Sequence, residues 1–170
     1  MIKLSPMSAG EYTNYVKRLI PNFAEELGRT GELSKNEALI KSNQIVGELL
    51  PRGLQTENHF LFNVKSGAND QIVGILYFAL QESGSDRSVF IYDIEIYDQF
   101  KGKGFGTEVM RSAEDLAHDL GAVEIWLHVF ANNTAANRLY TKLGYKVKKE
   151  FLGQNGEVTS RRMAKSLFTR

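Results

Sequence analysis

Cysteine is absent from the 170 residues of this chain. Its absence excludes disulfides, a thiolate nucleophile and thiolate zinc sites, and it suits a reducing compartment. Excess charge of either sign is also missing, because 21 basic and 20 acidic side chains leave a formal charge of +1. The chain therefore shows no bulk attraction to nucleic acid or to an anionic membrane. We expect partners that are small or locally recognised, with neither nucleic acid nor membrane among them.

Long hydrophobic runs are missing as well. The longest apolar stretch, Ile72 to Leu80, is too short to span a bilayer, and the N-terminus from Met1 to Pro6 has no apolar signal core. These features predict a cytoplasmic protein. The length falls within the usual range for one domain and allows a substantial buried core. We therefore expect a single domain over residues 1–170.

Strand and helix patterns alternate along the chain, which predicts an α/β (α+β) fold with helices on both faces of a mixed sheet. The first helix, which follows Ser8, should be kinked or broken near Ile20, because Pro21 removes a backbone hydrogen bond. Polar residues at 82–87 predict a turn. Further helices are predicted at about 34–49, 107–120 and after Asn133, and strands at 2–4, 59–65, 71–80, 89–97, 123–130, 145–152 and 158–164.

The most informative segment is Gln99-Phe100-Lys101-Gly102-Lys103-Gly104-Phe105-Gly106. It lies directly after a strand pattern and directly before a helical one, so several backbone N–H groups should point in one direction at a helix N-terminus. Glycine accepts positive φ there and lets a phosphate approach the backbone. The segment therefore predicts a phosphate-binding loop.

Two common phosphate loops do not fit this spacing. A P-loop for nucleoside triphosphates needs a serine or threonine after Gly-Lys, where this chain has Gly104. The dinucleotide fingerprint G-x-G-x-x-G would place its third glycine at Thr107 or at Val109. The spacing Q/R-x-x-G-x-G/A does fit, starting at Gln99.

A second block reads N-x-A-A-N-x-L-Y-x-K-L-G-Y from Asn133 to Tyr145. Together and in this order, the two blocks resemble the signatures of the GNAT superfamily of N-acetyltransferases, and the resemblance covers roughly residues 60 to 165. It implies a mostly antiparallel sheet in which the strands ending at Tyr97 and Phe130 are parallel and splay apart at their C-terminal ends. It also implies transfer of an acetyl group from acetyl-CoA to a primary amine by direct attack on the thioester, with coenzyme A as product.

The resemblance also implies a set of cofactor-binding residues. Pantetheine is an extended chain with two amides, and it can hydrogen-bond to a splayed strand as if it were a strand. Asn133 should in addition cap its helix, and ordinary surface roles for Asn137 and for the two loop lysines stay open. The implied set is Ile94, Ile96 and Tyr97 through their backbones, Lys101, Gly102, Lys103, Gly104, Phe105, Gly106 and Thr107 at the pyrophosphate, and Asn133, Asn137 and Tyr140 from the second block.

Acetyl transfer to an amine needs an oxyanion donor, an acid for the departing thiolate and, for some amines, a base. A backbone N–H near Ile96 is a natural oxyanion donor. Tyr140 occupies the tyrosine position of the second block, and a phenol with a pKa of about 10 can protonate a thiolate whose conjugate acid lies at about 8.5. The alternative is that Tyr140 is only a core residue, since it shares a helical stripe with apolar side chains.

The base is either Glu95 or His128, and a purely structural histidine is an equal alternative. Glu95 should lie on the opposite alternation phase from Tyr92 and Ile94. No histidine has companions at metal-ligand spacing, so no metal site is expected. The acceptor is a small-molecule or peptide amine, and the protein is a monomer or a homodimer. The alternative function is a non-catalytic acyl-CoA-binding module or sensor on the same fold.

Overall fold

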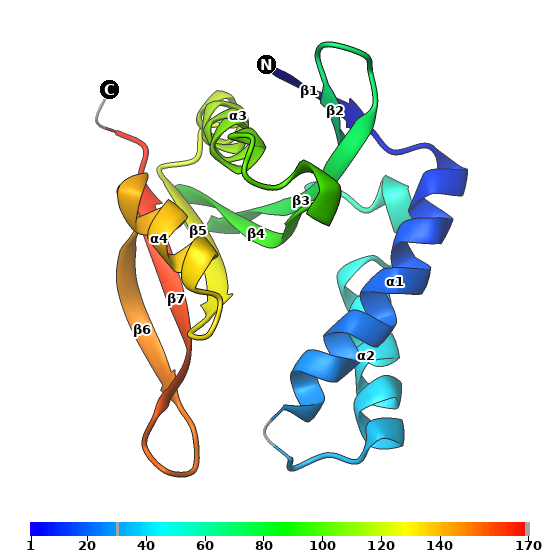
Figure 1. The fold of residues 1–170 in the computed structure, drawn as a ribbon, viewed down its shortest axis with the longest axis vertical. Helices are drawn as coiled ribbons and strands as arrows, with labels where there is room; N and C mark the ends of the chain where they lie inside the picture. The colour runs from blue at the N-terminus through cyan, green and yellow to red at the C-terminus, as the bar shows by residue number, and fades with distance from the viewer. Residues whose placement is uncertain (30, 169–170) are drawn as a thin grey trace. The chain divides into compact units, whose positions relative to one another are not determined.

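A computed structural model describes residues 1–29 and 31–168. The chain divides into two compact units: unit 1 combines Met1–Pro6 with the chain from Phe60 onward, and unit 2 is Met7–His59 (Figure 1). Among the described residues, no helix is both long enough and apolar enough to cross a membrane.

Unit 2 contains the helices α1 (Ala9–Gly28) and α2 (Lys35–Leu49) and the short 3-10 helix η1 (Gly53–Gln55). Each α-helix starts with a capping box, in which Ser8 or Ser34 exchanges hydrogen bonds with the glutamate three residues later. Of the kink or break predicted near Ile20, the break is wrong, because α1 continues through Pro21, and the kink stays a prediction. Packing against α2 holds the helix together, and the buried Ser42 hydroxyl donates to the Ile20 carbonyl at 2.6 Å.

Unit 1 is built on a sheet of seven strands in the spatial order β1-β2-β3-β4-β5-β7-β6. The pairs β1–β2, β3–β4, β5–β7 and β6–β7 are antiparallel, and β4–β5 is parallel. This arrangement confirms the predicted mixed, mostly antiparallel sheet. The strands are β1 (Ile2–Pro6), β2 (His59–Ser66), β3 (Ile72–Ser83), β4 (Asp86–Ile96), β5 (Glu124–Phe130), β6 (Lys146–Leu152) and β7 (Val158–Ser166).

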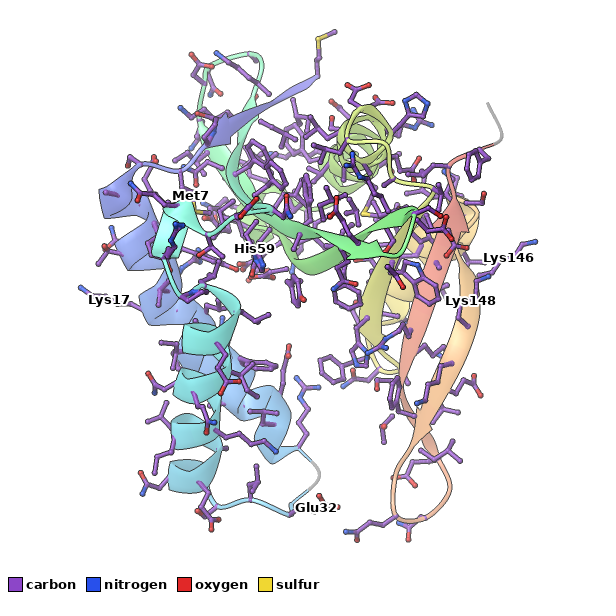
Figure 2. The ribbon with its side chains drawn as sticks, turned by 180° about the vertical axis from the view of Figure 1, so that it is seen from behind. Met7, Lys17, Glu32, His59, Lys146 and Lys148 are labelled. Atoms are coloured by element: carbon purple, nitrogen blue, oxygen red, sulfur yellow. The ribbon has the colours of Figure 1, made fainter. Side chains whose placement is uncertain are left out.

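The core of unit 1 joins one face of this sheet to α3 (Phe105–Asp119) and α4 (Thr134–Lys142). From β4 and β5 it receives Val89, Ile91, Ile125 and Leu127. The edge strand β6 carries Lys146 and Lys148, which project from the molecule (Figure 2). Charged side chains on an edge oppose pairing with another sheet.

Strand β4 contains one extra residue relative to β3. Tyr77 pairs with Asp93 whereas Phe78 pairs with Ile91, so Tyr92 is a β-bulge. The bulge changes the alternation, because Ile91 before it and Ile94 after it both pack on the core. Tyr92 instead lies against Tyr77, with ring centroids 5.1 Å apart. The expectation that Tyr92 shares the phase of Ile94 is therefore wrong.

Candidate functional site

Strands β4 and β5 pair over only part of their length. Their parallel ladder runs from Ser88 opposite Glu124 to Ile91 opposite Leu127. Beyond these residues β4 continues to Ile96 and β5 to Phe130 without pairing to each other. The predicted splay is therefore confirmed, and it begins at the bulge in β4.

The splayed part of β4 turns alternate peptide groups toward β3. The Tyr97 N–H donates to the Val73 carbonyl at 2.9 Å. The Glu95 carbonyl approaches Gly74 so closely that a Cβ on Gly74 would overlap its oxygen. Because backbone groups alternate in direction along a strand, the N–H groups of Ile94 and Ile96 point away from β3 and into the gap beside β5. These are the groups that the predicted pantetheine contacts require.

The same pattern speaks against a backbone contact at Tyr97. Its N–H is already bonded to Val73, and its carbonyl accepts from the Phe100 N–H at 2.8 Å. These two bonds close the turn of the short 3-10 helix η2 (Asp98–Phe100) that connects β4 to the glycine loop. Tyr97 thus positions the loop, and its contact with the cofactor stays a prediction.

The loop between η2 and α3 has the conformation expected of a phosphate-binding loop. Gly102 and Gly104 have φ of +75° and +85°, and no side chain caps α3 at Gly104. The first bond of the helix runs from the Glu108 N–H to the Gly104 carbonyl at 3.2 Å, so the N–H groups of residues 105–107 precede any helical partner. Among the described residues, nothing lies within 4 Å of a Cβ placed on Gly102 or Gly104. The loop therefore offers both open space and donors to an anion.

Two lysines flank this loop and differ in their contacts. The Lys101 Nζ pairs with the Asp98 carboxylate at 2.6 Å, and this hydrogen bond and charge lower the pKa of Asp98. The Lys103 Nζ lies 5.5 Å from the centroid of the Phe100 ring. Within the part of the chain that the structure describes, Lys103 has no carboxylate partner, which favours its ammonium as a phosphate contact.

Two asparagines organise the start of α4. Asn133 caps the helix as predicted, accepting from the Ala136 N–H at 3.2 Å. The Asn137 amide donates to the Phe130 carbonyl at 2.9 Å and to the Asn133 carbonyl at 2.7 Å, and its oxygen accepts from Arg161. Asn137 therefore ties the end of β5 to α4, and these bonds favour a positioning role over the predicted contact with the cofactor.

Tyr140 lies on α4 with only 7% of its surface exposed. Burial and the negative charge of Asp93 raise the pKa of Tyr140 to about 12. Asp93 lies in the splayed part of β4, so a charge at the splay acts on this phenol. The phenol keeps its proton at neutral pH, so Tyr140 is suited to donate a proton and unsuited to be a base.

The two candidate bases lie in different surroundings. The Glu95 side chain is exposed and lies on the face of β4 opposite the buried core. The His128 ring packs against Phe130 and Phe151, with centroids 5.7 Å and 5.3 Å apart. Burial and the charge of Arg162 lower the pKa of His128, so its imidazole is neutral at pH 7. A neutral imidazole can accept a proton, and the choice between the two bases stays open.

Sequence reasoning missed three residues that shape this region. Gly74 lies in the middle of β3, and an isolated glycine in a strand pattern is the usual signal of close backbone approach. Asp93 and Arg162 had no such signal, because their importance depends on contacts with Tyr140 and His128 from other elements. Among the residues that the structure describes, no group of three or more His, Cys, Asp or Glu side chains could hold a metal ion.

Comparisons with known proteins agree with this geometry. The profile of the acetyltransferase (GNAT) family matches residues 31–145. The uncharacterized N-acetyltransferase YycN of Bacillus subtilis is 33% identical over 145 residues, which cover 85% of this chain and 92% of YycN. The crystal structure of YycN superposes with a TM-score of 0.82 at 31% identity, over 91% of this chain and 98% of that one. A spermidine N-acetyltransferase from Vibrio cholerae, solved with CoA and spermine, shares the fold with a TM-score of 0.69 at 21% identity, over 98% of this chain and 95% of that one.

Proposed function

Since the chain belongs to the GNAT acetyltransferase family and is an acetyl-CoA-dependent N-acetyltransferase, we propose that its acceptor is a small-molecule or peptide primary amine. One observation carries the proposal. The parallel ladder of β4 and β5 ends at Ile91 and Leu127, and the same strand β4 leads into the uncapped N-terminus of α3. A strand with unpaired backbone groups and a helix N-terminus with free N–H groups therefore follow each other along the chain, as an extended thioester chain and its phosphates require.

The residues around the splay fit acetyl-CoA, which when bound supplies the reactive thioester. The N–H groups of Ile94 and Ile96 would bind the pantetheine amides. The N–H groups from Gly102 to Thr107 would bind the pyrophosphate, with Lys103 adding charge. The fit rests on the open space at the two positive-φ glycines and on the three α3 donors that have no helical partner.

Residues of the chain would then stabilise the developing oxyanion, protonate the departing thiolate and, for some acceptors, remove the amine proton. A backbone N–H near Ile96, other than those that bind the pantetheine amides, would stabilise the oxyanion. Tyr140 would donate its proton to the departing sulfur. A lysine-like amine with a pKa of about 10.4 is only roughly one part in a thousand neutral at pH 7, whereas an α-amine at about 8 needs little help. Glu95 or His128 would accept the amine proton where the acceptor is strongly basic.

We also propose that the two units form one acetyltransferase domain. The family match at residues 31–145 crosses the boundary between the units at His59. A cytoplasmic location and a monomeric or homodimeric state remain proposals from the composition of the chain.

The test is calorimetric titration with acetyl-CoA followed by a thiol-release assay with a panel of amines. We expect micromolar binding and thiol release that depends on the amine. Binding without amine-dependent release from any acceptor would support a non-catalytic acyl-CoA sensor instead.

A further inference from the structure

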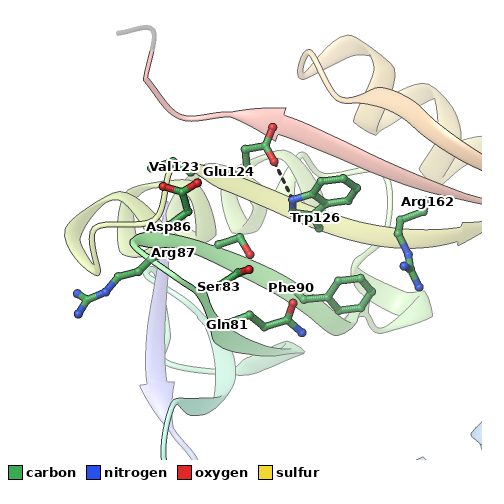
Figure 3. Close-up of a pocket in the computed structure, with 10 residues that line it drawn as sticks. Gln81, Ser83, Asp86, Arg87, Phe90, Val123, Glu124, Trp126 and Arg162 are labelled. Atoms are coloured by element: carbon green, nitrogen blue, oxygen red, sulfur yellow. Dashed lines mark hydrogen bonds between the residues drawn. The ribbon is translucent and has the colours of Figure 1, made fainter.

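A pocket lies on the sheet face opposite the α3 core. Along β4 and β5 the core receives Val89 and Ile125, so the alternate residues Phe90 and Trp126 face the other way. There they line a cavity of about 370 Å³ together with residues from β3 and β7. Figure 3 shows Phe90, Trp126 and Arg162 gathered on this face. All of the lining belongs to unit 1.

Arg162 is the distinctive residue of this pocket. Its guanidinium carbon lies 5.7 Å from the Phe90 ring centroid and 5.8 Å from that of Phe151. The two other cations of β7 are paired, Arg161 with Glu150 at 3.2 Å and Lys165 with Glu114 at 2.7 Å. Within residues 1–29 and 31–168, Arg162 has no carboxylate partner. A guanidinium held by aromatic rings keeps its N–H groups available for a planar anion, which it can bind through two hydrogen bonds.

The position of Arg162 connects the pocket to the reaction centre. Arg162 pairs across the sheet with His128 on β5. The preceding residue, Leu127, is the last of the parallel ladder, so the guanidinium lies where the splay begins. The far end of the pocket is formed by Glu124, Asp86 and Arg87, and Arg87 pairs with Glu82 at 3.1 Å.

Hydrogen bonds position the side chains of Trp126 and Gln81, which line the pocket between these two ends. The Glu124 carboxylate accepts from the Trp126 Nε1 at 3.1 Å (Figure 3). On β3, the Gln81 amide donates to the Tyr92 hydroxyl at 3.3 Å. The pocket thus has a cation beside the splay, aromatic rings along its length and carboxylates at its far end.

We propose that this pocket binds the acceptor and that the acceptor is an amine carrying a carboxylate, as in an amino acid. The proposal rests on the proposed acetyltransferase function. The carboxylate binds the Arg162 guanidinium, the amine points to the splay, and the remainder of the acceptor lies against Phe90 and Trp126. A polyamine would bring positive charge against an unpaired guanidinium, so it fits this pocket poorly.

The experiment compares amines that differ only by a carboxylate, lysine with cadaverine and phenylalanine with phenethylamine, and adds spermidine. We expect kcat/KM in thiol release to favour each amino acid at least tenfold over its decarboxylated partner. Arg162→Gln should reduce this preference tenfold or more, mainly through KM. Arg162→Lys keeps the charge without the planar fork and should give an intermediate loss. The matched control is Arg111→Gln, at an exposed position of α3, which should leave the preference unchanged.

Three results would overturn the proposal: equal rates for lysine and cadaverine, faster acetylation of spermidine than of lysine, or equal loss on both members of a pair in Arg162→Gln. In each of these cases, thiol release that depends on an amine would still support the acetyltransferase function. If no amine supports thiol release, the proposed function fails instead. The pocket is then tested directly by calorimetry with N-acetyl-lysine and N-acetyl-cadaverine in the presence of CoA, where equal affinities would refute a carboxylate site at Arg162.

Discussion

Tyr140 is deeply buried, and the negative charge of Asp93, in the splayed part of β4, acts on its hydroxyl. We predict that Tyr140→Phe lowers turnover about a hundredfold or more if protonation of the thiolate limits the rate. Acetyl-CoA affinity, measured by calorimetry, should barely change. Tyr145→Phe is the control, because Tyr145 is also a buried tyrosine and the charge that acts on its hydroxyl is that of Glu114. Similar losses of turnover in both variants would indicate that Tyr140 acts only through packing.

Gly104 tests the phosphate loop. Gly104→Val should weaken acetyl-CoA binding at least tenfold, because its side chain would occupy the space beside the N–H groups of α3. Valine is also strained at a φ of +85°, so the control must carry the same strain. Gly156→Val provides it, since Gly156 has φ of +80° in the turn between β6 and β7 and equally open surroundings. If both variants bind acetyl-CoA like the wild type in calorimetry, the loop is not part of the site.

Gly74 sets the path of β4 at the splay. In Gly74→Ala the new Cβ would overlap the Glu95 carbonyl oxygen, and a paired backbone cannot move aside cheaply. We expect a loss of about 1–3 kcal/mol in urea unfolding and weaker acetyl-CoA binding, because the Ile94 and Ile96 N–H groups would shift. Gly47→Ala, in an open helical position of α2, should instead stabilise the protein by about 0.5–1 kcal/mol. Unchanged stability and affinity in Gly74→Ala would show that β4 tolerates displacement.

At the scale of elements, the sequence predicts local structure well wherever one local rule is enough. The serine caps of α1 and α2, the glycine turn before α3 and the asparagine cap of α4 all have short-range causes. The turn predicted at 82–87 is confirmed only at Gly84 and Ser85, because Glu82 pairs with Arg87 and Ser83 with Asp86, so that β3 continues to Ser83 and β4 begins at Asp86. A run of polar residues indicates solvent exposure. The exposed strands of a hairpin can have this composition as readily as a loop can.

Long-range pairing sets the limit of such prediction. The bulge at Tyr92 depends on the register between β3 and β4. Because apolar residues stand on both sides of it, the sequence alone does not show that the inward-outward alternation of side chains changes there. The glycine loop and Tyr140 can be identified from motifs, whereas the pairing of Arg162 with His128 follows only from the antiparallel neighbours β5 and β7. The predicted cofactor site can therefore be identified from sequence motifs, whereas the proposed acceptor pocket cannot.

The pairing of β5 with β7 makes a prediction about pH. Burial and then the Arg162 charge lower the pKa of His128 below its usual value of about 6.5. In an NMR titration of the imidazole, Arg162→Gln should therefore raise this pKa. An unchanged value would mean that the guanidinium is not beside His128.

The same shift makes a contribution to stability that depends on pH. The pKa of His128 is lower in the folded chain than in the unfolded chain. At a pH between these two pKa values, the unfolded chain therefore binds more protons at His128 than the folded chain does. The contribution is complete above about pH 6.5 and is lost as the pH falls through this window toward the folded pKa. In urea unfolding, the difference in the free energy of unfolding between pH 8 and pH 5 should be smaller for His128→Gln than for the wild type.

At the scale of the whole molecule, the chain leaves unit 1 after β1 and returns to it at β2, and these two strands pair from Ile2 with Ser66 to Pro6 with Phe62. Unit 2 is thus inserted between two paired strands. Every residue of the predicted cofactor site, from Ile94 to Tyr140, lies in unit 1. Cofactor binding should therefore stabilise unit 1 directly, and unit 2 only if the two units unfold together.

Hydrogen exchange can separate these cases. At a concentration of acetyl-CoA one hundred times its Kd, mass action adds about 2.7 kcal/mol to the stability of the form that binds. The slowest amides of β3 and α3 exchange only through global opening, so we expect them to slow about a hundredfold. We predict smaller slowing for α1 and α2, which carry none of the predicted cofactor residues. Equal slowing in both units would instead show that they unfold as one cooperative body. In either case Gly104→Val should reduce the slowing about tenfold or more at the same concentration of acetyl-CoA, because its loop holds the phosphates less well.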